Sequence, residues 1–504
     1  MEAPPYKGID GGEADDDGRQ PRRTGTMWTA SAHIITAVIG SGVLSLPWGV
    51  AQLGWVAGPA VMVLFGAVIH YCSVLLVECY RSGDGAGTGG RRNRTYMDAV
   101  RANLGGAKVR LCGVLQFANF FGVCVGITIA SSISMLAIRR AGCFHVRGRD
   151  QREACGGSSR PYMVVYGALQ VVFSQIPDLH KMSWLSTLAS VMSLSYSAIG
   201  ISLAVAQVIA NGGIKGTIIG VFIGGAGAGV GVTSMQKIWR TLQAFGNIAF
   251  AYGFSFILLE IQASHSPLRS FLNSWLLMLI DTVKEVAPPA TETKVMRKAV
   301  GVSVATTTIV YLLCGCAGYA AFGDTSPDNL LTGFGFFEPF WLLDLANAGV
   351  VVHLVGTYQV VAQPVFAFLD RRAAEGTWPG SAWLGGGKER VLLRVGPTAR
   401  VTVSPFRLAW RTAFVCVTTA ASTLLPFFGS VVGLIGAASF WPLTVYFPVE
   451  MYVASRRVPR WGARWVCLQA LSAGCLAVSL AASAGSVAGV VEAFKAHNPF
   501  CWTC

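Results

Sequence analysis

Apolar runs long enough to cross a bilayer alternate with short polar loops along most of this chain. A transmembrane helix needs about 20 mostly apolar residues in succession. The pattern predicts about eleven such helices, and therefore an all-α polytopic membrane protein with one transmembrane domain over residues 27–495. The predicted spans are 28–52, 55–79, 110–138, 162–178, 183–210, 244–262, 299–322, 338–369, 408–426, 428–453 and 463–489.

The first span contains residues that interrupt a helix. Gly40, Ser41 and Gly42 lie in its middle, and Pro47 follows. Broken backbone is tolerated inside a membrane where it is buried in protein or lines a cavity. The freed amides at the start of a half-helix attract a carboxylate, which is how secondary transporters hold substrates. The first span therefore predicts a binding site.

The sixth span, 244–262, has a second interruption, at Gly253. In an inverted repeat of five helices, the first and sixth helices occupy corresponding positions. Close helix packing is the alternative explanation for a single membrane glycine. Because the two interruptions fall at matching positions, we favour a shared site.

Residues 216–233 are apolar enough for a twelfth span, but they are rich in glycine. Glycine destabilises a helix by about 1 kcal/mol per position relative to alanine. We therefore expect an outside loop or small hairpin, which leaves eleven helices.

Only 13% of the 504 residues are charged, where a soluble domain has about 25%. The net charge of +14 does not indicate nucleic-acid binding, because the basic residues lie in short loops between apolar spans. The positive-inside rule places loops 80–109, 370–407 and 454–462 in the cytosol, with the N-terminus. Residues 1–26 are read as a disordered cytosolic tail, and residues 496–504 as a short extracellular C-terminus.

Loop 139–161 is basic but falls on the outside, against the rule, and it contains Cys143 and Cys155. An outside loop can be oxidised, so a disulfide is favoured over two free thiols. The sequence has no convincing set of metal ligands and no nucleophile–base pair inside the spans. We therefore expect that the protein has no metal site and no cofactor and is not an enzyme.

Several long segments resemble the plant amino acid permeases, in the amino acid/auxin permease group of the amino acid–polyamine–organocation superfamily. The matching segments are residues 29–55, 237–240, 247–252, 313–324 and 358–364. The resemblance implies a leucine-transporter-like fold with helices 1 and 6 broken. It also implies proton-coupled uptake of neutral and acidic amino acids across the plasma membrane, with the proton as coupling ion. The implied partners are the amino acid and the lipid bilayer, and the oligomeric state is left open.

The resemblance also implies roles for particular residues. Amides around Ile39, Gly40, Ser41 and Gly42 would hold the substrate carboxylate, and carbonyls around Phe250, Ala251 and Tyr252 would hold its ammonium group. Phe254 would wall the side-chain pocket. The candidates for proton coupling are His33, Asp344 and His353. The alternatives are neutral histidines satisfied by hydrogen bonds and, for Asp344, an interfacial carboxylate.

The chain departs from the family pattern at residues 263–280, eighteen residues inserted between Gln262 and Asp281. They are either a cytosolic insertion with an interfacial helix or retained non-coding sequence in a gene model, which we favour. The second reading adds an inactive product of mis-splicing as an alternative to transport. A transport-inactive amino acid sensor or receptor is a separate alternative.

Overall fold

The structure is a computed structural model. It describes residues 27–82, 91–93, 95–148, 155–175, 183–224, 232–258, 289–334, 340–375, 391–395 and 399–496. Three predicted features lie outside these ranges: the tail over residues 1–26, the insertion over 263–280 and the C-terminal residues 497–504. Those predictions stay untested.

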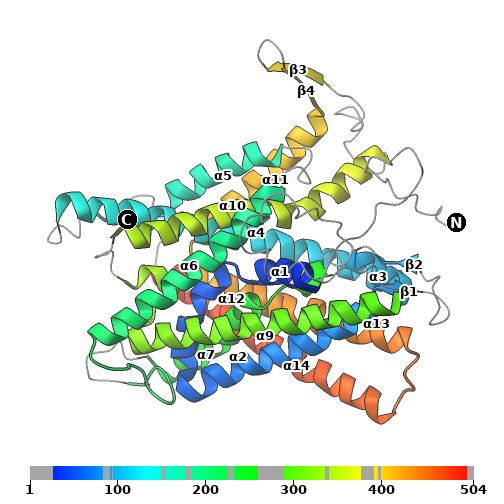
Figure 1. Cartoon of the computed structure of the whole chain (residues 1–504), viewed down its shortest axis with the longest axis horizontal. Helices are drawn as coiled ribbons and strands as arrows, with labels where there is room; N and C mark the ends of the chain where they lie inside the picture. The colour runs from blue at the N-terminus through cyan, green and yellow to red at the C-terminus, as the bar shows by residue number, and fades with distance from the viewer. Residues whose placement is uncertain are drawn as a thin grey trace.

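Long helices lie side by side along the long axis of the molecule (Figure 1). Two small antiparallel hairpins accompany them, β1 (Arg81–Ser82) with β2 (Arg91–Arg92) and β3 (Val391–Val395) with β4 (Ala399–Val403). The β3–β4 hairpin, which the sequence pattern did not predict, projects away from the helices (Figure 1). The helices are α1 (Met27–Val38), α2 (Leu46–Glu78), α3 (Tyr96–Asn103), α4 (Gly106–Arg147), α5 (Arg160–Ser174), α6 (Ser183–Ala210), α7 (Ser234–Ala251), α9 (Pro289–Phe322), α10 (Phe340–Ala374), α11 (Pro405–Leu424), α12 (Phe428–Ser439), α13 (Phe447–Ser455) and α14 (Ala463–Ala496).

Seven helical stretches in the described part are long and apolar enough to cross a bilayer. Two other elements are shorter than a full span, namely α1 with 12 residues and α5 with 15. The all-α polytopic architecture is confirmed, while the count of eleven helices stays a prediction. α4 and the continuous stretch Phe428–Ser455 form the centre, each with 67% of its most apolar window buried, whereas α14 is peripheral with 28%.

Three predicted boundaries were wrong by nine or ten residues, one of them the start of α9 at Pro289 instead of residue 299. α7 begins at Ser234, ten residues before the predicted start of the sixth span, and α4 continues to Arg147, well beyond the predicted end at residue 138. The start of α7 is fixed by a capping box, in which Thr233 and Gln236 exchange hydrogen bonds.

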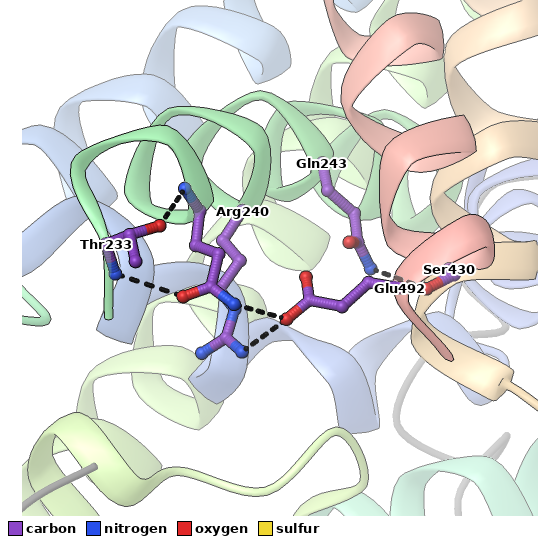
Figure 2. A network of polar contacts seen from close by, with 6 residues as sticks. Thr233, Arg240, Gln243, Ser430 and Glu492 are labelled. Atoms are coloured by element: carbon purple, nitrogen blue, oxygen red, sulfur yellow. Dashed lines mark hydrogen bonds and ion pairs between the residues drawn. The ribbon is translucent and has the colours of Figure 1, made fainter. Parts of the chain in front are cut away.

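The first turns of α7 look too polar for a membrane helix, but their polar side chains have partners on neighbouring helices. Arg240 lies 3.4 Å from the Glu492 carboxylate of α14, and the Gln243 amide donates to Ser430 of α12 at 3.3 Å (Figure 2). Because these polar side chains form hydrogen bonds and ion pairs with neighbouring helices, they can lie within α7 instead of marking its end.

The glycine-rich stretch after α6 has no helix in its described residues, 216–224, 232 and 233, as expected. It packs on the turn between the first two spans, where Gly54 has a φ of 85°. The Val221 amide donates to the Ala51 carbonyl at 3.0 Å, and a Cβ on Gly220 would lie 2.4 Å from that same oxygen. Glycine is therefore required for this close approach of two backbones.

Several basic segments meet at one end of the bundle. Glu78, the last residue of α2, pairs with Arg297 near the start of α9 and with Arg456 just after α13. Lys108 at the start of α4 pairs with Glu450 of α13 at 3.3 Å. These contacts place parts of the basic loops on the same face, while their cytosolic orientation stays a prediction.

Candidate functional site

The first helix is interrupted after Val38, where Gly40 adopts an extended conformation with φ −119° and ψ −155°. A 3₁₀ turn over Ser41–Ser45 then leads into α2. The first hydrogen bond after the break joins the Val43 amide to the Gly40 carbonyl at 3.4 Å. The amides of Ser41 and Gly42 precede that bond, so they lie at the positive end of a half-helix, where an anion is favoured.

The second interruption follows Ala251, the last residue of α7. The Gly253 amide turns back to the Phe250 carbonyl at 3.0 Å, and a 3₁₀ turn over Ser255–Ile257 comes next. The carbonyls that end α7 form the negative end of that half-helix, where a cation is favoured.

The two interruptions touch each other. A Cβ on Gly42 would lie 2.8 Å from the Ala251 Cα and 3.2 Å from the Phe250 ring. The hydroxyl of Tyr311, on α9, lies 2.7 Å from the Val38 carbonyl and 2.8 Å from the Ala251 carbonyl. Because a hydroxyl carries one hydrogen, it donates to one of these two carbonyls at a time. Tyr311 thus links both broken helices, and no pattern in the sequence pointed to it.

A cavity of about 200 Å³ lies beside the two interruptions. It is lined by backbone from both breaks and by side chains of α4, α6, α10 and α12. None of the described lining residues is charged. They are Thr36, Ala37, Val38, Gly40, Ser41, Gly42, Asn119, Val123, Ile127, Ala189, Phe250, Ala251, Gly253, Phe256, Ile257, Leu354, Gly356, Thr357, Val360, Val361 and Ser439.

Five of the eight sequence-derived binding residues line this cavity, namely Gly40, Ser41, Gly42, Phe250 and Ala251.

The other three are buried but lie outside the lining. Ile39 is enclosed in the core. Tyr252 directs its hydroxyl to Thr308 of α9, 3.1 Å away. Phe254 precedes the 3₁₀ turn and does not line the cavity. Phe256 and Ile257 line it instead, because the turn changes which residues face the cavity.

His353 lies in α10 with its ring buried next to the first interruption. Its Nδ1 is 2.8 Å from the Ala189 carbonyl, and since a carbonyl only accepts, Nδ1 carries a hydrogen. Its Nε2 is 3.2 Å from the Thr357 hydroxyl, and a Cβ on Gly40 would lie 3.8 Å from it. The Thr357 hydroxyl also lies 2.9 Å from the His353 carbonyl, and Thr357 lines the cavity. Its position four residues after His353, on the same helix face, was a usable signal in the sequence.

The other two proton-coupling candidates stand apart from this arrangement. Asp344 lies nine residues before His353 on α10, roughly 13 Å along the axis. Its Oδ1 is buried and has no hydrogen-bond partner among the described residues. His33 lies in α1, and its side chain is outside the described part of the structure.

Asn119 is a lining residue that sequence reasoning missed. It lies in α4, and its Nδ2 is buried without a hydrogen-bond partner among the described residues. A lone amide in an apolar span is a detectable signal for a binding function.

Away from the cavity, Cys143 at the end of α4 and Cys155 before α5 are joined by a disulfide. The described residues contain no group of three or more His, Cys, Asp and Glu side chains that could hold a metal ion.

Two interrupted helices that meet at a cavity, inside a bundle of apolar helices, define a membrane transporter. The chain belongs to the plant amino acid permeases of the transmembrane amino acid transporter protein family, whose family model matches residues 23–283 and 272–492. It is 55% identical to amino acid permease 3 of Arabidopsis thaliana, over 96% of this chain and 94% of that one. It is 54% identical to amino acid permease 2 of the same plant, over 96% and 92%.

These matches confirm the family resemblance read from the sequence and the expectation of a transporter rather than an enzyme. The chain is also similar to the structure of Mhp1, a nucleobase-cation-symport-1 family transporter, in a closed conformation with bromovinylhydantoin bound. That likeness is distant, with 14% identity and a TM-score of 0.47 over 95% of each chain, and it adds nothing to the helix arrangement described above.

Proposed function

We propose that this protein imports amino acids across the plasma membrane by proton-coupled symport, through alternating access to the cavity between the two interruptions. The observation that carries the proposal is the meeting of opposite half-helix ends at one cavity with no charged side chain among its described lining. The family and the relatives named amino acid permeases support the same substrate class.

The backbone complements an amino acid zwitterion. The amides of Ser41 and Gly42 are arranged to donate to the carboxylate, and the carbonyls that end α7, including that of Ala251, to accept from the ammonium group. Both charges of the substrate are then balanced by helix ends. The main chain common to all amino acids is recognised by the main chain of the protein.

The rest of the cavity receives the substrate side chain. Val123, Ile127, Phe256 and Val360 are apolar, and Asn119 adds one amide. The hydroxyl groups of Thr36, Thr357 and Ser439 also line the cavity. This wall favours neutral side chains and offers an acidic one a few polar groups, which is compatible with a broad neutral and acidic range.

Thr357 connects the protonation of His353 to the cavity. When His353 is neutral, its Nε2 accepts, and the Thr357 hydroxyl can donate to it over 3.2 Å. When Nε2 gains a proton it must donate, so the Thr357 hydroxyl turns to the His353 carbonyl, 2.9 Å away. The protonation state of the imidazole therefore sets the direction in which the Thr357 hydroxyl, a group of the cavity wall, donates its hydrogen bond. Among the three candidates, this contact favours His353 as the proton carrier.

The test is uptake of radiolabelled neutral and acidic amino acids in yeast deficient in amino acid uptake. Uptake is measured at pH 5 and pH 7.5, with and without an uncoupler. We expect acid-stimulated, uncoupler-sensitive uptake by the full chain. Thr357→Val is expected to flatten the pH dependence and lower uptake at pH 5 by about tenfold, less than the roughly 10²–10⁴-fold that a positioned proton-transferring group contributes, because Thr357 does not carry the proton itself. The matched control is Thr423→Val, since the Thr423 hydroxyl donates to the Ala420 carbonyl of its own helix and Thr423 is not among the described lining residues of the cavity.

Each outcome bears on a different part of the proposal. Uptake that is insensitive to the uncoupler would refute proton coupling but would still support amino acid transport. Surface-expressed protein without any uptake would instead favour the sensor. A version lacking residues 263–280 is measured in parallel, because uptake by that version alone would identify the insertion as retained non-coding sequence.

A further inference from the structure

A second cavity, of about 510 Å³, lies where the ends of α2 and α13 meet the start of α14. The basic loops lie at this end of the bundle. The segment that connects α13 to α14 is seen at the lower right of Figure 1. We call this cavity the arginine pocket. It is lined by Glu78, Tyr452, Arg456, Val458, Pro459, Gly462, Ala463 and Arg464.

Positive charge exceeds negative charge around the arginine pocket. Both oxygens of Glu78 are occupied, one by Arg297 and the other by Arg456 at 3.0 Å. The Arg464 guanidinium lies 5.0 Å from the centre of the Tyr452 ring, and no described carboxylate is within ion-pair distance of it. Among the lining residues, two guanidinium groups against one carboxylate leave one positive charge unbalanced, and Arg297 beside Glu78 adds another outside the lining, so the pocket is suited to an anion.

The loop that forms one wall has a defined and strained backbone. α13 ends in a Schellman motif, with the Val458 amide donating to the Val453 carbonyl at 3.1 Å and the Arg457 amide to the Ala454 carbonyl at 3.3 Å. Arg457 occupies the position that glycine normally takes, with a φ of 47°, and Trp461 has a φ of 66°. Two non-glycine residues in left-handed conformations within five positions cost free energy, and such strain concentrates at binding sites.

The surroundings of the pocket match the surface of a membrane. Trp461 is 81% exposed, and its ring lies 5.2 Å from that of Trp465. Exposed tryptophan beside arginine is typical of the headgroup level of a bilayer. Val466 of α14 and Tyr71 of α2 are also partly exposed and offer an apolar surface for an acyl chain.

We infer that the arginine pocket binds the phosphate of an anionic phospholipid headgroup, with Arg456 and Arg464 donating to its oxygens. Free phosphate shares this chemistry. The neighbouring tryptophans and the apolar surface favour the lipid, because they contact parts that free phosphate lacks. This site is separate from the substrate cavity and does not depend on the proposed transport mechanism.

The experiment measures binding to the purified full-length protein in a neutral detergent. The probes are dioctanoyl-phosphatidylinositol 4-phosphate, dioctanoyl-phosphatidylcholine and inorganic phosphate. The variants are Arg464→Gln, Arg456→Gln and the matched control Arg460→Gln, which removes the same charge from the loop without lining the pocket. Arg456→Gln also removes an ion pair with Glu78, so Arg464→Gln, whose side chain is exposed, is the primary variant.

We expect the anionic lipid to bind at least tenfold more weakly to Arg464→Gln, the loss expected for a hydrogen bond to a charged group. Arg460→Gln is expected to lose at most about fivefold, the contribution of one basic residue to diffuse attraction. Equal losses in the two variants would show diffuse surface charge and overturn the site. Inorganic phosphate that competes with the lipid at equal concentration, or phosphatidylcholine that binds as tightly, would overturn the assignment to an anionic lipid.

Discussion

The interruptions of the first helix and of α7 meet at one cavity but differ in construction. The first break exposes amides and needs a glycine, because Gly42 lies against the backbone of Ala251. The second exposes carbonyls and carries aromatic residues, and a Cβ on its Gly253 would come no closer to any atom than 3.2 Å, the distance to the Phe250 carbonyl. The site thus obtains opposite polarities from two helix ends, while the steric demand falls on the first one.

The two interruptions also differ in what holds them. α1 is tied to α9 by side-chain hydrogen bonds, such as that from Ser31 to the Ala299 carbonyl at 3.3 Å. α7 donates from Gln243 to Ser430 of α12, and it also packs backbone to backbone on that helix, where a Cβ on Gly436 would lie 2.2 Å from the Gly246 carbonyl. Tyr311 contacts carbonyls of both helices. Side-chain hydrogen bonds therefore hold both half-helices, and α7 is set apart by its additional close backbone packing on α12.

The strongest test of this contrast is Gly42→Ala. The new methyl group would overlap the backbone of Ala251, so the two half-helices must separate. We expect uptake to fall by about 100-fold, the size of loss that a displacement of roughly 1 Å causes in a positioned site. The measurement is the uptake rate at equal surface expression. The control is Gly474→Ala in α14, where a Cβ would meet nothing within 4 Å, and equal losses in both variants would contradict the proposed contact.

A smaller effect is expected from Tyr311→Phe, which keeps the ring and removes the hydroxyl between the two interruptions. We expect apparent substrate affinity to weaken by up to about tenfold, because a net hydrogen bond contributes about 0.5–1.5 kcal/mol. Half-saturation is measured beside Tyr252→Phe, whose hydroxyl contacts Thr308 instead of a carbonyl of either break. A larger effect in Tyr252→Phe would show that Tyr311 does not link the two helices.

The smallest effect is expected from Gly253→Ala at the second interruption. Its nearest neighbour is at 3.2 Å, and the backbone there has no positive φ, so a methyl group needs only a slight adjustment. We expect uptake within about twofold of the unmodified protein, as for a tolerated substitution. The measurement is the same uptake rate. A loss as large as that of Gly42→Ala would remove the distinction between the two breaks.

The sequence located both interruptions because glycine within an apolar span is a local signal, as at Gly42 and Gly253. It could not locate the start of α7, since Arg240 and Gln243 look polar until Glu492 and Ser430 are seen opposite them. Those partners lie far away in the chain, and their position depends on tertiary packing.

The same limit applies within the cavity. Phe256 lines the cavity where Phe254 was expected, because a 3₁₀ turn changes which side chains face it. The pattern of apolar residues does not reveal that turn. Tyr311 reaches the site from α9 through long-range packing alone. Asn119 and Thr357, by contrast, could have been singled out as polar residues in apolar spans.

The uncharged lining of the proposed substrate cavity has a consequence for the response to membrane voltage. An electric field acts on the net charge that crosses it, and a neutral amino acid, being a zwitterion, carries none. Within the described lining, the empty and the amino-acid-filled cavity therefore have equal charge. If the coupled proton resides on His353, the carrier with bound amino acid has one extra positive charge. A membrane potential of 100 mV then contributes about 2.3 kcal/mol per elementary charge to the step that moves this charge inward. The same voltage then has no charge to act on while the empty carrier returns, so the cell's potential drives one half of the cycle and not the other.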